Sequence, residues 1–430
     1  MKNEIKIDLP SRRERRYVVR SSEQFLKLLS PYVKRKKFSN NEYVYTIYFN
    51  NDEHVVPFEY SIKARKYLPG FIELPVLDND VYFLDLKMGK GEHQKEKIRL
   101  EATLEEATKI INEKYSFSEI PLRPYVLVEY LRHHYIPKNT GGVRITLDTN
   151  LKYFFFSKGQ REGIEIGRED DYTRIEIKEQ EQSNKGLVIL MEELLGKINA
   201  FPIISKKFTA CDFLKNYRMK MCAKPLYKEL KGFEVESKLE IEHEIDQEGI
   251  FYKIKTFFKD NDGFEWSNYY PYTHETASIN RYYKKDGLFK ALIKRDKARI
   301  ITKSDEEIIK DQYNLNCIIK RKEVKGDRIS IWSELLTSAT LLGELRRKRK
   351  AFWIVNKQTK RVYHISLDCC ESYNKKLYQV EVEHTGRLIE QKNTKEESII
   401  DDIANITHIL VNNFPLKPSQ LTKQNWLGIK

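Results

Sequence analysis

The sequence predicts an α+β protein made of two tandem antiparallel β-barrel domains with flanking helices. Length is the first reason, because 430 residues exceed what one hydrophobic core usually serves. The second is a series of segments in which apolar and charged residues alternate, as they do in strands. The third is an internal repetition that runs in the same order through both halves of the chain.

Strands are predicted where alternation coincides with β-branched and aromatic residues. These segments are residues 43–49, 81–87, 143–148, 173–178, 351–355, 362–367 and 378–383. Other stretches repeat apolar residues at helical spacing, namely residues 22–29, 103–113, 187–198, 333–342 and 397–412.

Several of these strands alternate aliphatic residues with Lys, Arg or Glu rather than with small polar residues. A period of two places those charges together on one face of the sheet. On an open sheet this would be a solvated face. In a closed barrel the same pattern lines the interior with charge.

The repetition consists of short matches in the same order. They are ERR at 14–16 with ESK at 236–238, LK at 86–87 with TK at 302–303, KIR at 97–99 with KRK at 320–322, RITLD ending at 148 with YHISLD ending at 368, RIEIK from 174 with QVEVE from 379, and SK at 205–206 with TK at 422–423. The offsets are about 222, 216, 223, 220, 205 and 217 residues. They predict domains of residues 1–223 and 232–430, with a seam between Ala223 and Gly232.

The charge balance favours a polyanionic partner. Lys and Arg number 77 against 63 Asp and Glu, so the formal net charge is +14, and such an excess attracts polyanions at long range. Nucleic acid, inorganic polyphosphate, nucleotides and anionic membrane all remain candidates, and a basic but solvated surface is the alternative.

The cysteines and the hydropathy bear on the compartment. Five cysteines form no C-x-x-C pair, and the odd count argues against a disulfide framework. No apolar run of 18 residues occurs, so no membrane-spanning segment is expected. A cytoplasmic protein is predicted.

Basic side chains on many separate strands are the candidate phosphate ligands of the first domain. A barrel that gathers them would need a polyanion to offset their mutual repulsion. They are Arg16, Lys63, Arg65, Lys87, Lys97, Arg99, Arg132, Arg144, Lys178 and Lys206.

Acidic residues alternate with these cations, among them Glu14, Asp85, Glu129, Asp148 and Glu176. Cross-strand ion pairs could account for each of them without a metal. Alternatively, some hold Mg²⁺ or Mn²⁺, hard cations that take oxygen ligands and bridge phosphate oxygens. Glu14 and Glu176 are the preferred metal ligands.

Residues from about 10 to 215 resemble the polyphosphate polymerase domain of the vacuolar transporter chaperone (VTC) family, a branch of the triphosphate tunnel metalloenzymes, or CYTH proteins. The resemblance rests on short segments in family order, which are ERRYVV from Glu14, KARKY from Lys63, LDLK from Leu84, KIR from Lys97, LRPYVLVEYLR from Leu122, VRITLD from Val143, IEIK from Ile175 and ISKKF from Ile204. Arg16 stands where the family more often has Lys, Lys63 where Arg is usual and Asp85 where Glu is usual, so the charge is kept.

The second domain begins with FEVESK, in which Glu234, Glu236 and Lys238 match the alternating Glu-x-Glu-x-Lys signature of the wider tunnel superfamily. Alternation puts both acids and the ammonium on one strand face, where the acids can hold metal and the base phosphate. An ordinary exposed strand is the alternative, because acidic residues continue the alternation beyond the motif. Glu381 is a third candidate metal ligand, and the candidate phosphate ligands are Lys238, Lys294, Lys303, Lys320, Lys322 and Lys423.

The resemblance implies metal-dependent phosphoryl transfer on a triphosphate or polyphosphate chain, with little covalent work by the protein. A polyphosphate polymerase that uses a nucleoside triphosphate is the leading expectation, with Glu176, Lys178 and Arg144 as catalytic candidates. The alternatives are a triphosphatase acting on inorganic triphosphate, a nucleotide or an RNA 5′ end, and a non-catalytic module that binds polyphosphate or nucleotides. The superfamily also includes adenylyl cyclases.

Two further motifs can be explained without assigning them a separate metal or nucleic-acid site. His133 and His134 lack a spaced third ligand, so an ordinary histidine pair is favoured over a metal site. The run RRKRK at 346–350 could bind nucleic acid, but the repetition aligns it with the strand around Tyr130 to Arg132, so phosphate ligands on a barrel strand explain it equally well.

Overall fold

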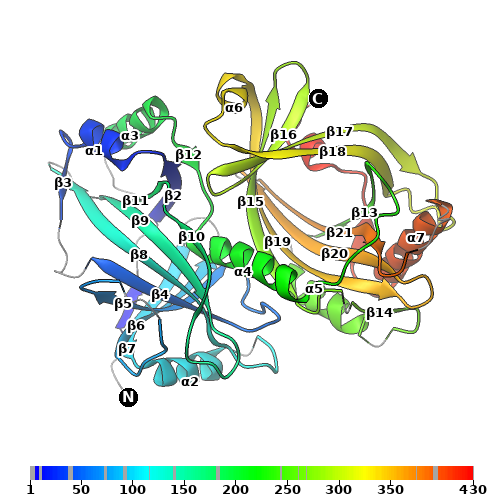
Figure 1. The fold of residues 1–430 in the computed structure, drawn as a ribbon, viewed down its shortest axis with the longest axis horizontal. Helices are drawn as coiled ribbons and strands as arrows, with labels where there is room; N and C mark the ends of the chain where they lie inside the picture. The colour runs from blue at the N-terminus through cyan, green and yellow to red at the C-terminus, as the bar shows by residue number, and fades with distance from the viewer. Residues whose placement is uncertain are drawn as a thin grey trace. The chain divides into compact units, whose positions relative to one another are not determined.

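The computed structural model divides the chain into two compact units, Met1–Leu214 and Lys215–Lys430, and the class is α+β as predicted. The structure describes residues 5–8, 12–36, 42–71, 75–90, 94–115, 117–138, 142–180, 185–242, 245–259, 261–267, 269–373, 375–390 and 396–429. Each unit is an antiparallel sheet with helices on its outer face (Figure 1).

In the described part of the first unit, twelve strands form the sheet, in the order β1-β7-β6-β5-β4-β8-β9-β11-β2-β12, with β10 on β9 and β3 on β8. The strands are β1 (Ile5–Asp8), β2 (Arg12–Val19), β3 (Val33–Arg35), β4 (Tyr43–Asn50), β5 (Tyr60–Leu68), β6 (Tyr82–Lys90), β7 (Gln94–Ala102), β8 (Arg123–Pro137), β9 (Val143–Phe155), β10 (Ile164–Glu169), β11 (Thr173–Gln180) and β12 (Phe201–Pro202). The helices are α1 (Ser22–Leu29), α2 (Leu104–Lys114), α3 (Lys185–Lys197) and α4 (Lys206–Cys222), and the boundary between the units falls within α4.

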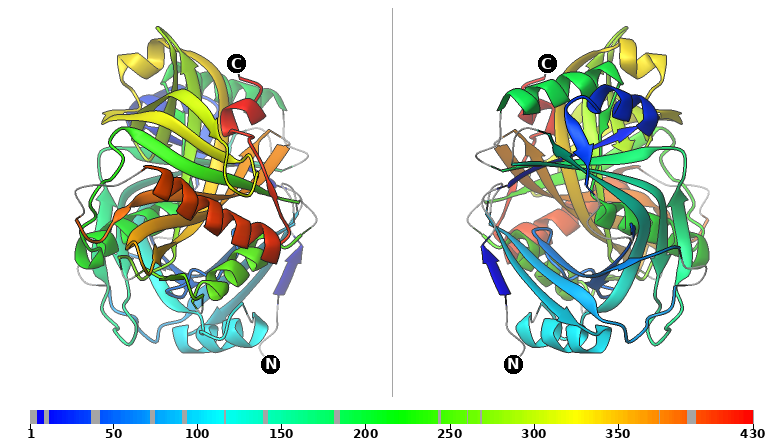
Figure 2. Two further views of the ribbon diagram at one scale, coloured as in Figure 1. Left: turned by 90° about the vertical axis from the view of Figure 1, so that its right-hand side faces the viewer. Right: turned by 90° about the vertical axis from the view of Figure 1, so that its left-hand side faces the viewer.

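The apolar core of the first unit lies on the outer face of this sheet. Ile145 and Leu147 of β9 and Ile175 and Ile177 of β11 pack on α1 and α3, which contact one another and are drawn together in Figure 2. Since alternate side chains point to opposite faces, this packing leaves the charged residues of the same strands on the inner face.

The second unit contains a closed eight-stranded antiparallel barrel. Its strands pair in the order β19-β15-β16-β17-β18-β13-β21-β20, and β20 pairs back to β19. The elements of this unit are β13 (Phe233–Ile241), α5 (Gln247–Phe257), β14 (Phe264–Trp266), β15 (His274–Lys284), β16 (Leu288–Lys294), β17 (Lys297–Ile309), β18 (Ile318–Ser330), α6 (Glu334–Ser338), β19 (Thr340–Asn356), β20 (Arg361–Ser372), β21 (Lys375–Arg387), α7 (Glu396–Asn413), β22 (Leu416–Pro418) and α8 (Lys423–Trp426).

The core of the second unit also lies outside its strands. Phe251 and Ile254 of α5 and Ile403 of α7 pack with Phe352 of β19 and Val380 of β21. The two helices cover the outer surface of the strands in Figure 2. Helix packing therefore stabilises this barrel from outside and leaves its interior free for polar side chains.

The prediction of two closed barrels holds for the second unit only. Among the described residues of the first unit, β2 and β7 do not pair, so its sheet remains open. In the second unit the corresponding strands, β13 and β18, do pair. The physical reason is that β1 pairs with β7 and occupies the edge that closure would need.

Most of the predicted elements are confirmed, and one is partly wrong. Residues 333–342, predicted as helical, form only the short α6 before β19 begins at Thr340. Strand pairing along the whole 17-residue β19 outweighs the local helical spacing. No helix in the described part of the chain is both long and apolar enough to cross a membrane.

Candidate functional site

The inner face of the first unit carries a concentration of charge, which we call the first charged face. Its residues come from β2, β5, β6, β7, β8, β9, β11 and the start of α4. They are Glu14, Arg16, Lys63, Arg65, Asp85, Lys87, Arg99, Arg132, Arg144, Asp148, Glu176, Lys178 and Lys206. Lys97, also predicted here, lies on β7, but its side chain falls outside the described part of the structure.

Four side chains on adjacent strands β2 and β11 form an alternating quartet of acids and bases. The register places Arg16 opposite Glu176 and Glu14 opposite Lys178. Arg16 Nη2 lies 2.9 Å from Glu14 Oε2, and its Nε lies 3.2 Å from Glu176 Oε1. Lys178 Nζ lies 3.3 Å from Glu14 Oε1 and 2.8 Å from Glu176 Oε2. Arg144 on β9 is directly opposite Lys178.

The carboxylates of the quartet are ionised at neutral pH. Burial raises the pKa of Glu14, but Arg16 and Lys178 outweigh this effect and hold it at about 2. Burial acts in the same direction on Glu176, and Lys178, Arg16 and Arg132 lower its pKa well below the ordinary value.

A buried ion-pair group lies next to the quartet. Arg132 of β8 donates two hydrogen bonds of 2.6 Å to Asp148 of β9, and Lys206, at the start of α4, pairs with the same carboxylate. The Arg132 guanidinium is also 3.7 Å from Glu176. Asp148 thus orients two cations, whereas the spacing of these charges along the chain does not say which of them pair.

Lys63, Arg65 and Lys87 differ from the other cations because they form no ion pair with any carboxylate in the described part of the first unit. Burial, Arg65 and Lys87 lower the pKa of Lys63 well below its ordinary value. Burial, and then Lys178 and Arg65, lower the pKa of Lys87 to about 7. In the free protein, Asp85 lies near enough to act on all three basic groups, but none of them has a carboxylate in ion-pair contact among the described residues.

The sheet curves strongly enough to bring distant strands together. In strand order, β6 and β11 are separated by β5, β4, β8 and β9. Nevertheless, Lys87 of β6 lies near enough to Lys178 of β11 and Glu14 of β2 for their charges to shift its pKa. The first charged face is therefore concave.

Anion binding at this face is expected to take up protons. A bound phosphate chain should return the pKa of Lys87 from about 7 toward its ordinary value of 10.5, so by linkage the affinity for tripolyphosphate falls above pH 7, by up to about tenfold per pH unit. Without ligand, the folded state favours the neutral form of Lys87 more than the unfolded state does. The contribution of Lys87 to the free energy of unfolding therefore decreases as the pH falls from 10.5 toward 7.

Calorimetric titration in two buffers of different ionisation enthalpy measures this proton uptake at pH 8.5. The Lys87→Met variant is the control, because ionisation of the ligand itself contributes equally to both proteins. Equal proton uptake by the variant and the wild type would contradict the assignment.

Sequence reasoning missed the tyrosines of the first charged face. Tyr130 is 1% exposed, and its hydroxyl lies 3.3 Å from Thr46 Oγ1, which accepts a hydrogen bond from Arg65. Lys206 Nζ lies 4.6 Å from the centroid of its ring. The sequence could have indicated this position, because side chains two residues apart on a strand point to the same face and Tyr130 precedes Arg132 by two residues.

In the second unit, the barrel encloses a cavity of about 400 Å³, here called the second cavity. Predicted site residues that line it are Glu234, Glu236, Lys238, Lys303, Glu381 and Lys423. Arg347 and Arg349, from the run at 346–350 that the sequence suggested as possible phosphate ligands, also line the cavity. Lining residues that were not predicted as site residues include Lys290, Arg321, Glu323, Lys325 and Glu383.

Three predicted ligands, Lys294, Lys320 and Lys322, do not line the second cavity. Lys320 instead pairs with Glu396 of α7, at 2.5 Å. Side chains alternate along β18, so Arg321 points inward and its two neighbours do not. The error came from aligning KIR at 97–99 with KRK at 320–322. Lys87 and Lys303 are equivalent in the repetition, and Lys87 pairs with Lys97 whereas Lys303 pairs with Glu323. The strand registers therefore align Lys97 with Glu323.

The other repeat matches agree with the strand registers. Arg132 pairs with Asp148 in the first unit, and Arg349 pairs with Asp368 in the second. Likewise, Arg16 pairs with Glu176 in the first unit, and Lys238 pairs with Glu381 in the second. Lys206 bonds to Asp148, and Lys423 lies 2.9 Å from Asp368.

The second cavity holds more carboxylates than the first charged face, and they are closely spaced. Lys238 Nζ lies 2.7 Å from both Glu236 and Glu381. Burial, and then Glu234 and Glu236, raise the pKa of Glu383 to about 7. Carboxylate oxygens are the donors that Mg²⁺ and Mn²⁺ prefer, so the donor sets of both units suit such a cation.

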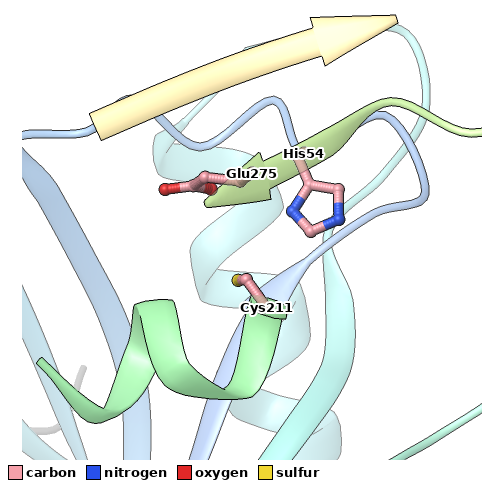
Figure 3. Close-up of side chains that lie close together, drawn as sticks. All are labelled: His54, Cys211 and Glu275. Atoms are coloured by element: carbon pink, nitrogen blue, oxygen red, sulfur yellow. The ribbon is translucent and has the colours of Figure 1, made fainter. Parts of the chain in front are cut away.

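We assign no metal centre to the described histidines and cysteines. His133 lies 3.4 Å from Glu42, and burial with Arg132 and Arg144 nearby lowers the pKa of His134 to about 3. Figure 3 draws His54 and Cys211, which belong to the first unit, and Glu275, which belongs to the second. They are therefore no basis for a shared site. The described cysteines form no disulfide.

Fold and site together define a class, which is an α+β protein whose antiparallel strands present paired cations and carboxylates to an inner surface. Residues 11–214 match the family model of the VTC domain. The first unit is therefore a VTC domain.

Solved structures with some likeness to the chain include candidate adenylate cyclases and an RNA triphosphatase. A candidate adenylate cyclase from Vibrio parahaemolyticus is 14% identical, with a TM-score of 0.30, over 48% of this chain and 98% of its own. One from Bacillus halodurans is 13% identical, with a TM-score of 0.27, over 46% and 94%. The RNA triphosphatase of S. pombe is 10% identical, with a TM-score of 0.23, over 49% and 90%. These values are too low to transfer an activity. A comparison with curated proteins finds no match.

Proposed function

We propose that the protein carries out metal-dependent phosphoryl transfer on a triphosphate or polyphosphate chain, as a polyphosphate polymerase that uses a nucleoside triphosphate. The observation that carries the proposal is the first charged face, where Lys63, Arg65 and Lys87 lack carboxylate partners among the described residues and lie opposite the Glu14, Arg16, Glu176 and Lys178 quartet. The VTC domain match over residues 11–214 supports it.

The unpaired cations would bind the chain's oxygens. Phosphate oxygens accept charge-assisted hydrogen bonds from ammonium and guanidinium groups. Asp148 keeps Arg132 and Lys206 in fixed positions, so their donors are already oriented when the chain arrives. Such preorganised cations stabilise the charge that develops during in-line transfer.

Glu14 and Glu176 are the residues that would hold Mg²⁺ or Mn²⁺. Both are ionised at neutral pH, because nearby cations keep their pKa values low, and they lie on adjacent strands. When bound, the cation would neutralise charge on the phosphate groups. Lys178 and Arg144 would then hold the chain beside them.

We propose the same class of ligand for the second cavity, and therefore two tandem tunnel domains of related origin. The matching order β17-β16-β15-β19-β20-β21-β13 and β6-β5-β4-β8-β9-β11-β2 supports this proposal. We further propose that the protein acts in the cytoplasm.

The reaction is tested by incubating the full chain with ATP and Mn²⁺, followed by separate assays for polyphosphate, free phosphate and cyclic nucleotide. Chain growth would support the polymerase. Release of phosphate without chains would replace it with a triphosphatase, and RNA with a 5′-triphosphate is then the next substrate. An absence of turnover with retained polyphosphate binding would indicate a binding module.

Replacement of Glu176 is expected to separate turnover from binding. The Glu176→Gln change removes one charged oxygen donor while the unpaired cations remain, so turnover should fall about 100-fold or more and polyphosphate affinity should be retained. Glu193→Gln, at an exposed position of α3, is the matched control. Unchanged turnover would remove Glu176 from the mechanism.

A further inference from the structure

The two units carry different charges at equivalent positions. Lys178 pairs with Glu14, and Glu383 pairs with the equivalent residue Glu236, so the strand registers align Lys178 with Glu383. Thr46 and Asn280 lie at equivalent places on equivalent strands. Thr46 pairs with Arg65 and Asn280 pairs with Leu292, so Arg65 is aligned with Leu292. The second cavity thus lacks a cation at both positions and has a carboxylate in place of one of them.

Most cations of the second cavity are already paired with carboxylates. Glu234 accepts from Lys303 at 2.6 Å and from Arg321 at 2.9 Å. Glu381 is bound by Lys238 at 2.7 Å, by Lys423 at 2.6 Å and by Arg349.

The network continues through the remaining acids. Glu323 lies 3.2 Å from Lys303 and 2.5 Å from Lys325, and Glu236 pairs with Arg321 and Lys238. Lys290 is the only cation of the cavity lining for which the described residues provide no ion pair.

This pairing changes what a phosphate chain would encounter. In the first charged face, Lys63, Arg65 and Lys87 can bind an anion without breaking an existing ion pair. In the second cavity the chain would have to displace carboxylates from their cations and remain beside them, which is unfavourable in a poorly solvated site. A divalent cation that binds those carboxylates would release the paired cations for the chain.

We propose that the second cavity takes up a phosphate chain only together with a divalent cation, whereas the first charged face takes it up without one. This inference rests on the proposed function, because it assumes that both units accept phosphate chains. The two units would then respond separately to the concentration of free metal.

Calorimetric titration of the full chain with tripolyphosphate, in EDTA and then in excess Mg²⁺, tests the inference. In EDTA we expect one binding event, lost in Lys63→Met/Lys87→Met and retained in Lys290→Met/Lys303→Met. In Mg²⁺ a second event is expected, with at least a 100-fold higher affinity than any binding by the second unit in EDTA, and Lys290→Met/Lys303→Met should lose it. Circular dichroism establishes that each variant is folded.

A charge change at one position provides a second measurement. Glu383→Lys restores the residue type of the equivalent Lys178, so it should add a second binding event in EDTA. Two events in EDTA for the wild type, or no event in the second unit under either condition, would overturn the inference while leaving binding by the first unit intact. No binding in any condition would instead overturn the proposed function.

Discussion

Replacing Lys63 and Lys87 with methionine is expected to weaken tripolyphosphate binding by at least about 100-fold and, at the same time, to stabilise the free protein. Each lysine would contribute a charge-assisted hydrogen bond of about 1.5–3 kcal/mol, and about 1.4 kcal/mol corresponds to a factor of ten in affinity. In the free protein the same groups have lowered pKa values because they are buried next to other cations. Methionine keeps the apolar stem and removes that repulsion.

The opposite signs distinguish a ligand site from a structural one. Affinity is measured by calorimetry at pH 6.5, and stability by urea unfolding of the same preparations. Lys27→Met/Lys109→Met, at exposed positions of α1 and α2, removes equal charge and should change neither quantity appreciably. A double variant that binds normally, or that unfolds more easily, would show that the two lysines support the fold instead.

Asp148→Asn is expected to destabilise the protein by about 3 kcal/mol or more, because removing one partner of a buried ion pair leaves its charges uncompensated. Asp148 is fully buried, and Arg132 is 5% exposed. The amide keeps the volume of the carboxylate but cannot balance both Arg132 and Lys206. Burial raises the pKa of Asp148, but Arg132 and Lys206 lower it far below the ordinary value, so in the wild type this stability is present above the unfolded pKa and is lost only in strong acid.

Tripolyphosphate should partly reverse this loss, because a bound anion supplies charge to the uncompensated cations. The increase in melting temperature on adding tripolyphosphate should therefore be larger in Asp148→Asn than in the wild type. Asp171→Asn, exposed between β10 and β11, is the control. An equal increase in both proteins would mean that Arg132 and Lys206 do not contact the ligand.

Strand parity made much of this structure predictable. Glu14 and Arg16, and likewise Glu176 and Lys178, could be assigned to one face because one residue separates the members of each pair. The correspondence of Asp148 with Asp368 followed from longer matching strings, RITLD and YHISLD.

Other features depend on long-range pairing that local sequence does not encode. Three basic residues in four positions, from Lys320 to Glu323, match KIR at 97–99 in more than one register, and only the pairing with β17 selects Arg321 as the inward residue. The open sheet of the first unit depends on β1, whose alternation over four residues, IKID, is too short to predict a strand by itself. Nor does the sequence say which cations remain unpaired, because Lys63 and Lys303 look alike until the neighbouring carboxylates are placed.

The position of the apolar core has a consequence for how such a chain can change over time. Much of the folding energy comes from the outer faces, where α1, α3, α5 and α7 pack, and inward cations without an ion pair, such as Lys63 and Lys87, add nothing to it. Substitutions at such inward cations can therefore alter ligand preference without endangering the scaffold, whereas a buried inward acid such as Asp148 is needed for stability. This separation would let a duplicated copy diverge in chemistry while keeping its architecture, and it makes exchange of inward residues between the units a practical route to redesign.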